Sequence, residues 1–310
     1  MFDIITFGSG VVDVIVDTDL NEKGKFMCYE VGSKILLKNL RFDIGGGGTN
    51  TAVAFSRLGL KTGWIGNIGK DNNGKEILKT IKTEKIKFLG KIKKNAVSGY
   101  SIILDSKQNN RTILTYKGIN DQLSFNEIEL RKIKTNWLYF TSALEKSFET
   151  QKKIARLFKK KGVKLAYNPS EYLIKRKDLS GLLKLTDILI LNKQEAELLL
   201  KKNKIKEKDL LKGLSYLGPK IIVITDKNKL ISCYDNQEGK NKKYYLKPNK
   251  IKVVERTGAG DAFASGFVAG LIVDWSIEKC LRLGLKESEA VIKHFGAKNE
   301  LLRMRLKKNV

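Results

Sequence analysis

Short apolar runs rich in β-branched residues alternate along the chain with segments whose apolar positions recur every three or four residues. The first pattern is typical of strands and the second of helices that bury one face. Strands are predicted at residues 2–7, 11–17, 61–68, 98–105, 111–116, 137–141, 164–168, 187–191, 220–225, 230–234, 244–246 and 251–254. Helices are predicted at residues 51–59, from 76 to about 81, and at 148–160, 177–184, 193–201, 206–214, 262–272 and 276–294.

From residue 137 onward the predicted strands and helices alternate, an order that gives a mostly parallel sheet with helices on both faces. Ligands of such sheets bind at the carboxyl ends of the strands. Residues 18–42 have no regular pattern, and a hairpin is predicted around 107–110. We therefore expect one α/β domain over residues 1–310, with a small β lid built from insertions at about 14–43 and 97–117.

Length and composition allow a large buried core and indicate no membrane segment. The chain has 310 residues, and no stretch of it is long and apolar enough to predict a transmembrane helix. The first residues enter a strand-like run without a basic leader, so no signal peptide is expected. Cys28, Cys233 and Cys280 stand apart from one another, which fits reduced thiols in a cytoplasmic protein better than disulfides or a zinc site.

A formal net charge of +27 raises the question of nucleic-acid binding. The positive charges are mostly lysines, and they are spread over most predicted helices and loops. The sequence contains no zinc finger and no basic helix that carries base-reading arginine or asparagine. We therefore expect no nucleic-acid partner and no membrane partner, and we interpret the charge as a field that attracts anionic ligands such as ATP.

A glycine-rich turn at residues 256–263 (Arg-Thr-Gly-Ala-Gly-Asp-Ala-Phe) carries the clearest chemical signal. It precedes an apolar helix, and the unpaired N–H groups at the start of a helix bind anions. Gly258 and Gly260 allow a phosphate to approach the backbone closely. A carboxylate at Asp261 repels phosphate, which favours a general base that takes a proton from an attacking hydroxyl. From these residues alone, an aspartate that only caps the helix is an equal alternative.

Three further turns contain candidate ligand-binding residues. Residues 45–48 are four glycines, followed by Thr49, Asn50 and a helix of small residues. Residues 192–195 (Asn-Lys-Gln-Glu) follow a predicted strand, a pattern that is also typical of a helix-capping box. The turn at 69–76 is close to a Walker A loop, but Glu76 stands where Ser or Thr must hold magnesium, so we interpret it as structural.

The order and spacing of these motifs closely resemble the PfkB (ribokinase-like) carbohydrate kinase family. Residues 45–59 look like its first signature, residues 257–263 look like its second, and Asn192 with Glu195 is similar to its NxxE motif. The resemblance runs from Gly8 to Ala297. It implies a ribokinase-like three-layer α/β/α sandwich, with a mostly parallel central sheet and a small β-sheet lid.

The resemblance also implies roles for individual residues. Asp261 would be the general base, and the anion hole for the transferred phosphoryl group would be formed by Gly258, Ala259 and Gly260. The substrate-binding positions would be Asp13, Gly45, Gly46 and Asn50. The nucleotide-binding positions would be Asn192, Thr225, Thr257, Gly258 and Gly260. Asn192 and Glu195 would order Mg²⁺ through water molecules.

The activity that the resemblance implies is transfer of the γ-phosphoryl group of ATP, with Mg²⁺, to a primary hydroxyl of a small sugar, as in ribokinases and fructokinases. Nucleoside kinase and sugar-phosphate kinase activities of the same family are alternatives, because acceptor choice depends on lid side chains that spacing does not identify. A catalytically weak relative that binds a sugar or nucleic acid is the alternative from another class. The unpaired edges of the lid also favour a homodimer through the lid.

Several residues depart from the family pattern. Glu255 and Arg256 replace an Asp-Thr pair, and because that aspartate often serves a monovalent cation, dependence on K⁺ is left open.

Arg111 begins the second lid strand, and it either reaches the active site or remains a solvated charge. Four further changes fall on the purine side and predict altered nucleotide affinity or base preference: Lys227, Asn228, Leu230 and Glu287.

Overall fold

A mostly parallel sheet runs through the centre of the structure, a computed structural model that describes residues 1–18, 22–24, 26–107, 111–227 and 229–308. Its strands are Phe2–Phe7 (β1), Thr62–Ile65 (β6), Lys87–Phe88 (β8), Thr135–Thr141 (β12), Lys164–Asn168 (β13), Ile188–Asn192 (β14), Ile221–Thr225 (β15), Ile231–Asp235 (β16) and Lys242–Leu246 (β17). Within the described ranges, these nine strands lie in the order β17-β16-β15-β14-β13-β12-β1-β6-β8. Neighbours from β8 to β15 are parallel, and β16 and β17 extend one edge in antiparallel pairing.

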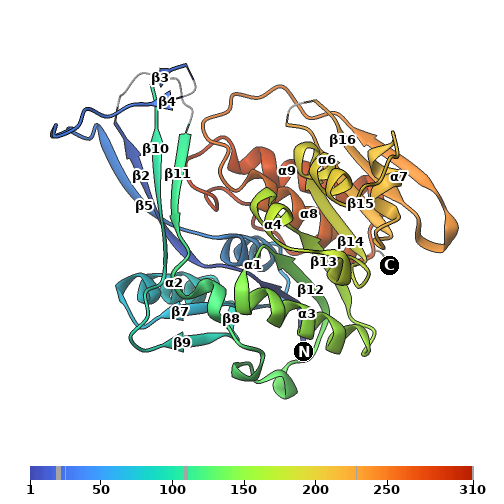
Figure 1. Cartoon of the computed structure of the whole chain (residues 1–310). Coiled ribbons are helices and arrows are strands. Elements are labelled where there is room, and N and C mark those ends of the chain that lie inside the picture. Colours follow the sequence, from blue (N-terminus) through green and yellow to red (C-terminus); the bar gives the residue numbers. More distant parts are fainter. Residues whose placement is uncertain (19–21, 25, 108–110, 228, 309–310) are drawn as a thin grey trace.

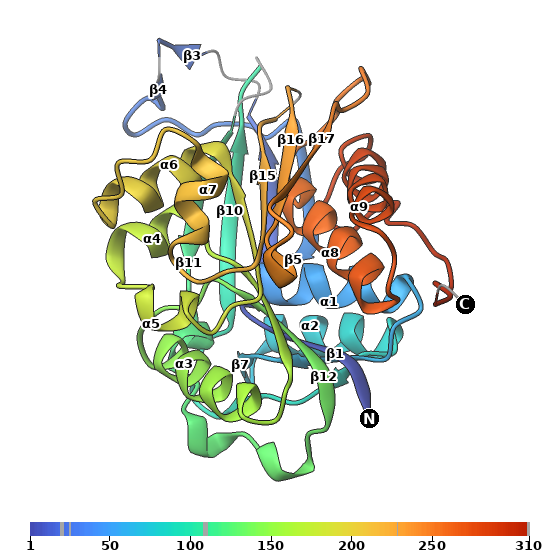
Figure 2. The same ribbon diagram turned by 90° about the vertical axis from the view of Figure 1, so that its right-hand side faces the viewer.

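Helices cover both faces of this sheet, which confirms the predicted three-layer α/β/α sandwich. They are Gly47–Arg57 (α1), Asn72–Thr83 (α2), Glu145–Lys159 (α3), Glu171–Arg176 (α4), Ser180–Leu183 (α5), Lys193–Lys202 (α6), Leu210–Ser215 (α7), Ala259–Ile272 (α8) and Ile277–Val291 (α9). Strand residues alternate between the faces: in β12, Leu138 and Phe140 join one apolar core, whereas Trp137 and Tyr139 join the other. Figure 2 shows α3 to α7 on one side of the sheet and α1, α8 and α9 on the other.

A second, four-stranded sheet stands apart from the main body at the upper left of Figure 1. Its strands are Val11–Asp17 (β2), Asn39–Gly45 (β5), Gly99–Asp105 (β10) and Arg111–Tyr116 (β11), and they lie in the order β11-β10-β2-β5. Two distant parts of the chain form this sheet, because β2 pairs in parallel with β10. We call it the lid sheet, and its presence confirms a small separate sheet. That residues 1–310 form a single kinase domain with insertions at 14–43 and 97–117 stays a prediction.

Short elements complete the described part of the chain. Two small sheets pair β3 (Glu22–Lys23) with β4 (Phe26–Met27), and β7 (Asn67–Gly69) with β9 (Lys91–Lys93). Short 3₁₀ helices lie at Gly118–Gln122, Phe125–Glu127, Leu130–Lys132 and Gln237–Gly239. The predicted hairpin between β10 and β11 is present, although residues 108–110 of its turn lie outside the described residues.

Two predictions about strands are wrong. Residues 251–254 form no strand, because the N–H groups of Val254 and Glu255 both bond to the carbonyl of Ile292 and tie this segment to the end of α9. Residues 18–42 were expected to have no regular pattern, but the end of this segment belongs to β5, which pairs along β2 from Asn39 to Gly45. Tertiary pairing thus decides which part of this segment is extended.

Two predictions about helices need correction. The helix after the glycine run begins at Gly47 and not at residue 51, since Gly46, with φ of 94°, already turns the backbone into α1. The helix predicted at 177–184 is shorter than expected: α5 spans only Ser180–Leu183, and a separate helix, α4, ends at Arg176. Lys177 has an extended backbone, and the Asp178 carboxylate accepts a hydrogen bond from the N–H of Ser180, which starts a new turn.

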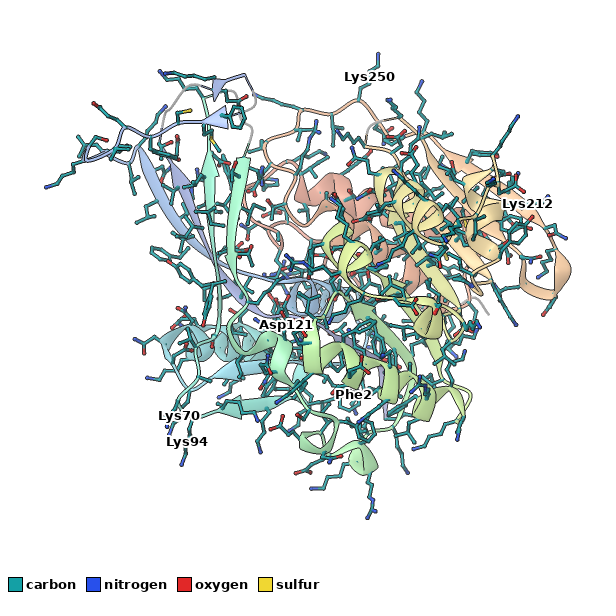
Figure 3. The ribbon with its side chains drawn as sticks, viewed as in Figure 1. Phe2, Lys70, Lys94, Asp121, Lys212 and Lys250 are labelled. Atoms are coloured by element: carbon teal, nitrogen blue, oxygen red, sulfur yellow. The ribbon has the colours of Figure 1, made fainter. Side chains whose placement is uncertain are left out.

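Lysines extend outward around the molecule and are not gathered on one side. Figure 3 shows Lys70 and Lys94, Lys212, and Lys250 projecting from three different parts of the periphery. Within the described ranges, no helix is long and apolar enough to cross a membrane. All three cysteines are free; Cys28 is exposed, and the other two are buried.

Candidate active site

The start of α8 offers backbone donors to an anion. Gly258 precedes the helix in the left-handed conformation (φ of 78°), and a Cβ there would lie 2.6 Å from Ala297, so this position requires glycine. The first hydrogen bond of the helix runs from Ala262 N–H to the Gly258 carbonyl at 2.8 Å. The N–H of Ala259 bonds to Arg256 at 3.3 Å. The N–H groups of Gly260 and Asp261 therefore start the helix without an intrahelical acceptor and can donate to a ligand.

Asp261 is held in place by a chain of two hydrogen bonds. Its Oδ2 accepts from Asn50 Nδ2 at 2.8 Å, and Asn50 Oδ1 accepts from Lys298 Nζ at 2.9 Å. Burial raises the pKa of Asp261, while the Asn50 hydrogen bond and the positive charge of Lys298 act in the opposite direction. Both polar atoms of the Asn50 amide are occupied by this chain, so Asn50 fixes the orientation of the Asp261 carboxylate.

Lys298, which bonds to Asn50 behind Asp261, is a residue of this site that sequence reasoning missed. It follows α9, is only 4% exposed, and lies close enough to Asp13, Asp43 and Asp261 for their negative charges to oppose the lowering of its pKa by burial. Burying a lysine is costly, and the negative charges of these three carboxylates offset part of that cost here. The sequence marks Lys298 only by its position two residues after Gly296. Lysine is too common in this sequence for that position alone to identify it.

A cavity of about 270 Å³ lies between the lid sheet and the main body, and we call it the lid-side cavity. From the lid sheet, alternate residues face it on each strand, as the two-residue period of a strand requires. They are Val11 and Asp13 of β2, Ser101 and Ile103 of β10, and Ile113, Thr115 and, just past the end of β11, Lys117. From the body it is lined by Ser9, Gly46, Gly47, Thr141, Ser142, Asn168, Ser170, Tyr172, Thr257 and Asp261.

Asp13 gives the lid-side cavity a buried carboxyl group. Burial raises its pKa to about 6, against the charge of Lys298 and a hydrogen bond from Ser101. A Cβ on Gly45 would lie 1.8 Å from Asp13 Oδ2, so the glycine lets the two strands close around this side chain. A carboxylate of this kind suits paired hydroxyl groups of a sugar.

A second cavity, of about 220 Å³, lies at the carboxyl ends of the central strands, and we call it the strand-side cavity. Asn168, Asn192 and Thr225 are the last residues of β13, β14 and β15, and all three line it. Its other lining residues are Ile190, Leu191, Glu195, Gly258, Gly260, Asp261 and Phe263. Asp261 and Asn168 line both cavities, so the Asp261 carboxylate lies where the two meet.

Asn192 and Glu195 form the capping box that starts α6. Asn192 N–H donates to Glu195 Oε2, and Glu195 N–H donates to Asn192 Oδ1, both at 2.9 Å. Burial, together with the negative charge of Glu171, raises the pKa of Glu195 to about 7. Within the described ranges, no three His, Cys, Asp or Glu side chains are grouped closely enough to chelate a metal. The carboxylate and amide of this pair could hold water ligands of Mg²⁺, an ion that keeps much of its hydration shell, and that role stays a prediction.

Arg111 reaches from the lid sheet to the loop before α8. Its Nη1 bonds to Glu255 Oε1 at 2.7 Å and also to the hydroxyl of Thr257. Glu255 is 4% exposed, and its other oxygen accepts the N–H of Gly296 at 2.7 Å. Of the two interpretations of Arg111, a solvated charge is wrong, because the ion pair joins the lid sheet to the anion-binding loop.

Some predicted residues do not line either cavity in the described part of the chain. Gly45 and Asn50 lie behind Asp13 and Asp261 as described above. Ala259, which was expected in the anion hole, also lines neither cavity, and its N–H is bonded to the Arg256 carbonyl. Lys227 and Leu230 are exposed on the turn after β15, and Asn228 lies outside the described residues.

The placement of Glu287 at the nucleotide pocket is wrong. This side chain is completely buried on α9, where Oε2 accepts the N–H of Leu302 at 3.3 Å and burial raises its pKa to about 8. It therefore packs against the carboxy-terminal segment of the chain and not against a ligand.

Comparison with known proteins gives consistent results. The family model described as pfkB family carbohydrate kinase matches residues 1–303. A 5-dehydro-2-deoxygluconokinase of Clostridium botulinum is 31% identical over 310 residues, covering 91% of this chain and 85% of that protein. Ribokinase of Thermotoga maritima superposes with a TM-score of 0.81 at 21% identity, covering 96% of this chain and 95% of that structure. Adenosine kinase of Sinorhizobium meliloti superposes with a TM-score of 0.80 at 20% identity, over 96% and 95%.

Proposed function

Because the chain belongs to the pfkB family of carbohydrate kinases, a family of phosphotransferases that act on hydroxyl groups, we propose that it transfers the γ-phosphoryl group of ATP, with Mg²⁺, to a primary hydroxyl of a small sugar. One observation carries this proposal: the Asp261 carboxylate lies at the junction of the lid-side and strand-side cavities, beside the free N–H groups that start α8. A kinase must bring a hydroxyl, a base and a phosphoryl group together at one such point.

The proposed reaction uses the residues at this junction in sequence. The acceptor lies in the lid-side cavity with its hydroxyl against Asp261, which takes the hydroxyl proton as the oxygen attacks the γ-phosphorus. The N–H groups of Gly260 and Asp261 donate to the phosphoryl oxygens, whose charge spreads as the bond to the leaving diphosphate breaks. Asn50 and Lys298 position the carboxylate, and closure of the lid sheet excludes water.

The strand-side cavity is the proposed place of the nucleotide phosphates and the metal. We assign Thr225, Asn192 and Glu195 to this side because they line it at the ends of the strands and the start of α6. Mg²⁺, when bound, neutralises negative charge on the phosphate oxygens. Glu195 would hold its water ligands, and the cation would in turn favour the ionised form of this carboxyl group. Arg111 already supplies a positive charge to Glu255, so we expect turnover without added K⁺.

The lid-side cavity favours a sugar over a nucleoside as the acceptor. Tyr172 is the single aromatic residue among its lining residues in the described ranges. A nucleobase is usually held by stacking and apolar contact, whereas the hydroxyls of Ser101, Thr115 and Ser142 suit a small polar ligand. Nucleoside kinase activity therefore remains the second candidate, and a protein that only binds sugars is the third.

The outer side of the lid sheet supports a homodimer as a further proposal. Leu40 and Phe42 of β5, and Leu114 and Tyr116 of β11, are about half exposed or more. Apolar side chains on edge strands are typical of strands that pair with another chain. Light scattering would test this, with a monomeric mass at all concentrations as the contrary result.

An ATP-consumption assay tests the proposed function. Purified protein with Mg²⁺, with and without K⁺, would be offered ribose, fructose, adenosine, other nucleosides, 2-keto-3-deoxygluconate and fructose 6-phosphate. We expect Mg²⁺-dependent turnover with a sugar acceptor and none with the Asp261→Asn variant. Turnover with nucleosides alone would support the second candidate, whereas silence with ATP, GTP and all acceptors would support the binding protein.

A further inference from the structure

A single basic side chain faces the lid-side cavity in the described part of the chain, although lysine and arginine together number 60 in the sequence. That side chain is Lys117, which directly follows β11 where the lid sheet meets the body (Figure 1). Its direction follows from strand alternation, since Ile113 and Thr115 line the same cavity whereas Leu114 and Tyr116 do not. The backbone therefore directs the Lys117 side chain into the proposed acceptor site, unlike the other described lysines and arginines.

The Lys117 ammonium is held in position but is not neutralised. Its Nζ donates to the hydroxyl of Tyr172 at 3.2 Å and lies 4.5 Å from the centre of that ring. Among residues 1–18, 22–24, 26–107, 111–227 and 229–308, no carboxylate forms an ion pair with it. Burial raises the pKa of Asp121 and the positive charge of Lys117 acts in the opposite direction, but the described side chains of these two residues form no ion pair. The Asp121 carboxylate accepts a hydrogen bond from the N–H of Leu144. A half-buried cation that forms no ion pair within the described ranges is a favourable position for an anionic group of a ligand.

Neutral hydroxyl groups accompany Lys117 at this end of the cavity. The hydroxyl oxygens of Ser142 and Ser170 lie 2.6 Å apart, and both residues line the cavity together with Tyr172. The carboxylates of Asp13 and Asp261 are the acidic groups among the lining residues. The lid-side cavity therefore contains a cation with hydroxyl donors around it and, separately, two carboxylates that suit sugar hydroxyls.

We propose that the acceptor is a sugar acid, whose carboxylate binds Lys117 while its hydroxyls bind Asp13 and its primary hydroxyl faces Asp261. This inference rests on the proposed kinase function and names the substrate class of the same site. A carboxylate fits better than a phosphate, because one lysine matches a single negative charge. A phosphate carries nearly two charges, and its recognition commonly includes bidentate contacts from arginine.

The test measures kcat/KM for acceptors that differ in charge. The panel is 2-keto-3-deoxygluconate for a carboxylate, fructose 6-phosphate for a phosphate, and fructose and ribose for neutral sugars. Wild-type protein is compared with Lys117→Met, which keeps a side chain of similar length and removes the charge, and with Lys70→Met as a control at an exposed lysine that does not line the cavity. Thermal melting of each variant shows whether it is folded.

We expect the wild type to prefer the acid over neutral sugars by about tenfold or more, the size of one charge-assisted hydrogen bond. Lys117→Met should remove most of this preference through KM, and Lys117→Arg should retain it, which keeps the test valid if the methionine variant does not fold. Lys70→Met should behave like the wild type.

Three results would overturn the inference. Equal or better turnover of neutral sugars would refute an anionic acceptor but leave the proposed kinase function in place. Preference for fructose 6-phosphate that is lost in Lys117→Met would replace the carboxylate with a phosphate. If no acceptor is phosphorylated, the proposed function fails, and calorimetric titration of 2-keto-3-deoxygluconate then tests Lys117 separately: binding that the methionine variant does not weaken refutes its role.

Discussion

The two cavities that meet at Asp261 are built in different ways. The strand-side cavity is formed by the ends of buried parallel strands and the start of α8, where a Cβ on Gly258 would clash with Ala297. The lid-side cavity is formed on one side by β10 and β11, and β11 is exposed along most of its length. The strand-side cavity surrounds the backbone and side-chain groups that phosphoryl transfer would need in one place. The lid-side cavity is lined by alternate side chains of lid strands.

Under the proposed function, this difference separates catalysis from specificity. A changed side chain near α8 disturbs a packed backbone or a buried hydrogen bond, so little variation is tolerated there. A changed side chain on β11 alters what the cavity binds without disturbing a core, as expected of residues on a lid. Substitutions on the two sides should therefore fail in different ways, and four experiments test this.

Asp261→Asn should have the largest effect, because both cavities depend on this residue. Without a base to accept the hydroxyl proton, kcat should fall by about 10³-fold. The amide is the same size, so ATP affinity and thermal stability should change little. Steady-state kinetics with nucleotide titration would show this, with Asp178→Asn as the exposed control. Turnover near the wild-type rate would exclude Asp261 as the base.

Lys298→Met removes the buried cation behind the base. Loss of a charge-assisted hydrogen bond should lower kcat by roughly 10- to 100-fold at neutral pH. The Lys298 charge lowers the pKa of Asp261 and of Asp13, so its removal raises both. Activity needs the ionised carboxylates, and the acid limb of the pH–rate profile should therefore move to higher pH.

The matched control for this experiment is Lys293→Met, at an exposed lysine of the same segment. A purely structural role for Lys298 would lower stability and leave the acid limb in place. The profile of kcat against pH, measured beside the melting temperature, distinguishes the two roles.

Gly258→Ala and Gly260→Ala form a pair that separates fold from chemistry in the strand-side cavity. At Gly258 a methyl group meets Ala297 and the backbone is left-handed, so stability should fall by about 2 kcal/mol. At Gly260 no atom lies within 4 Å of an added Cβ, and alanine is the better helix former. That variant should melt at or above the wild-type temperature yet lose about tenfold in kcat, because the methyl group enters the phosphoryl site.

Arg111→Ala should have the smallest effect of the four, confined to the lid-side cavity. It removes the ion pair to Glu255 and with it the contact between β11 and the anion-binding loop. We expect the acceptor KM to rise several-fold and ATP hydrolysis without acceptor to increase, while kcat at saturation changes less. Combining it with Glu255→Gln in a double-mutant cycle measures the coupling, and strictly additive effects would show that the pair does not act through the lid.

The same contrast explains what the sequence could predict. Strands such as β12 and β13 and the helix α8 were predictable because apolar periodicity reports burial directly. The turn at Gly258 was predictable because chemistry and backbone both require particular residue types there. The roles of Asp261, Asn192 and the other predicted site residues stay predictions, although the structure brings most of them to the two cavities.

The features that could not be predicted depend on tertiary contacts. β5 is a strand because β2 provides the pairing partner, and residues 251–254 are not one because Ile292 accepts their N–H groups. Lys117 and Lys298 differ from other lysines only in where the fold places them. Sequence periodicity carries no information of that kind.

The parallel pairing of β2 with β10 also has a consequence for synthesis of the protein. Val11 finds its partner Gly99 only after about a third of the chain has been made, and β11 follows later still. Closing so long a loop costs entropy that local contacts do not offset, so the lid sheet should gain protection from hydrogen exchange later than a local helix such as α2 during refolding. Until then, β2 can pair with β5 along one edge only, and its other edge is open, so this is the stage at which the lid sheet is most exposed to aggregation.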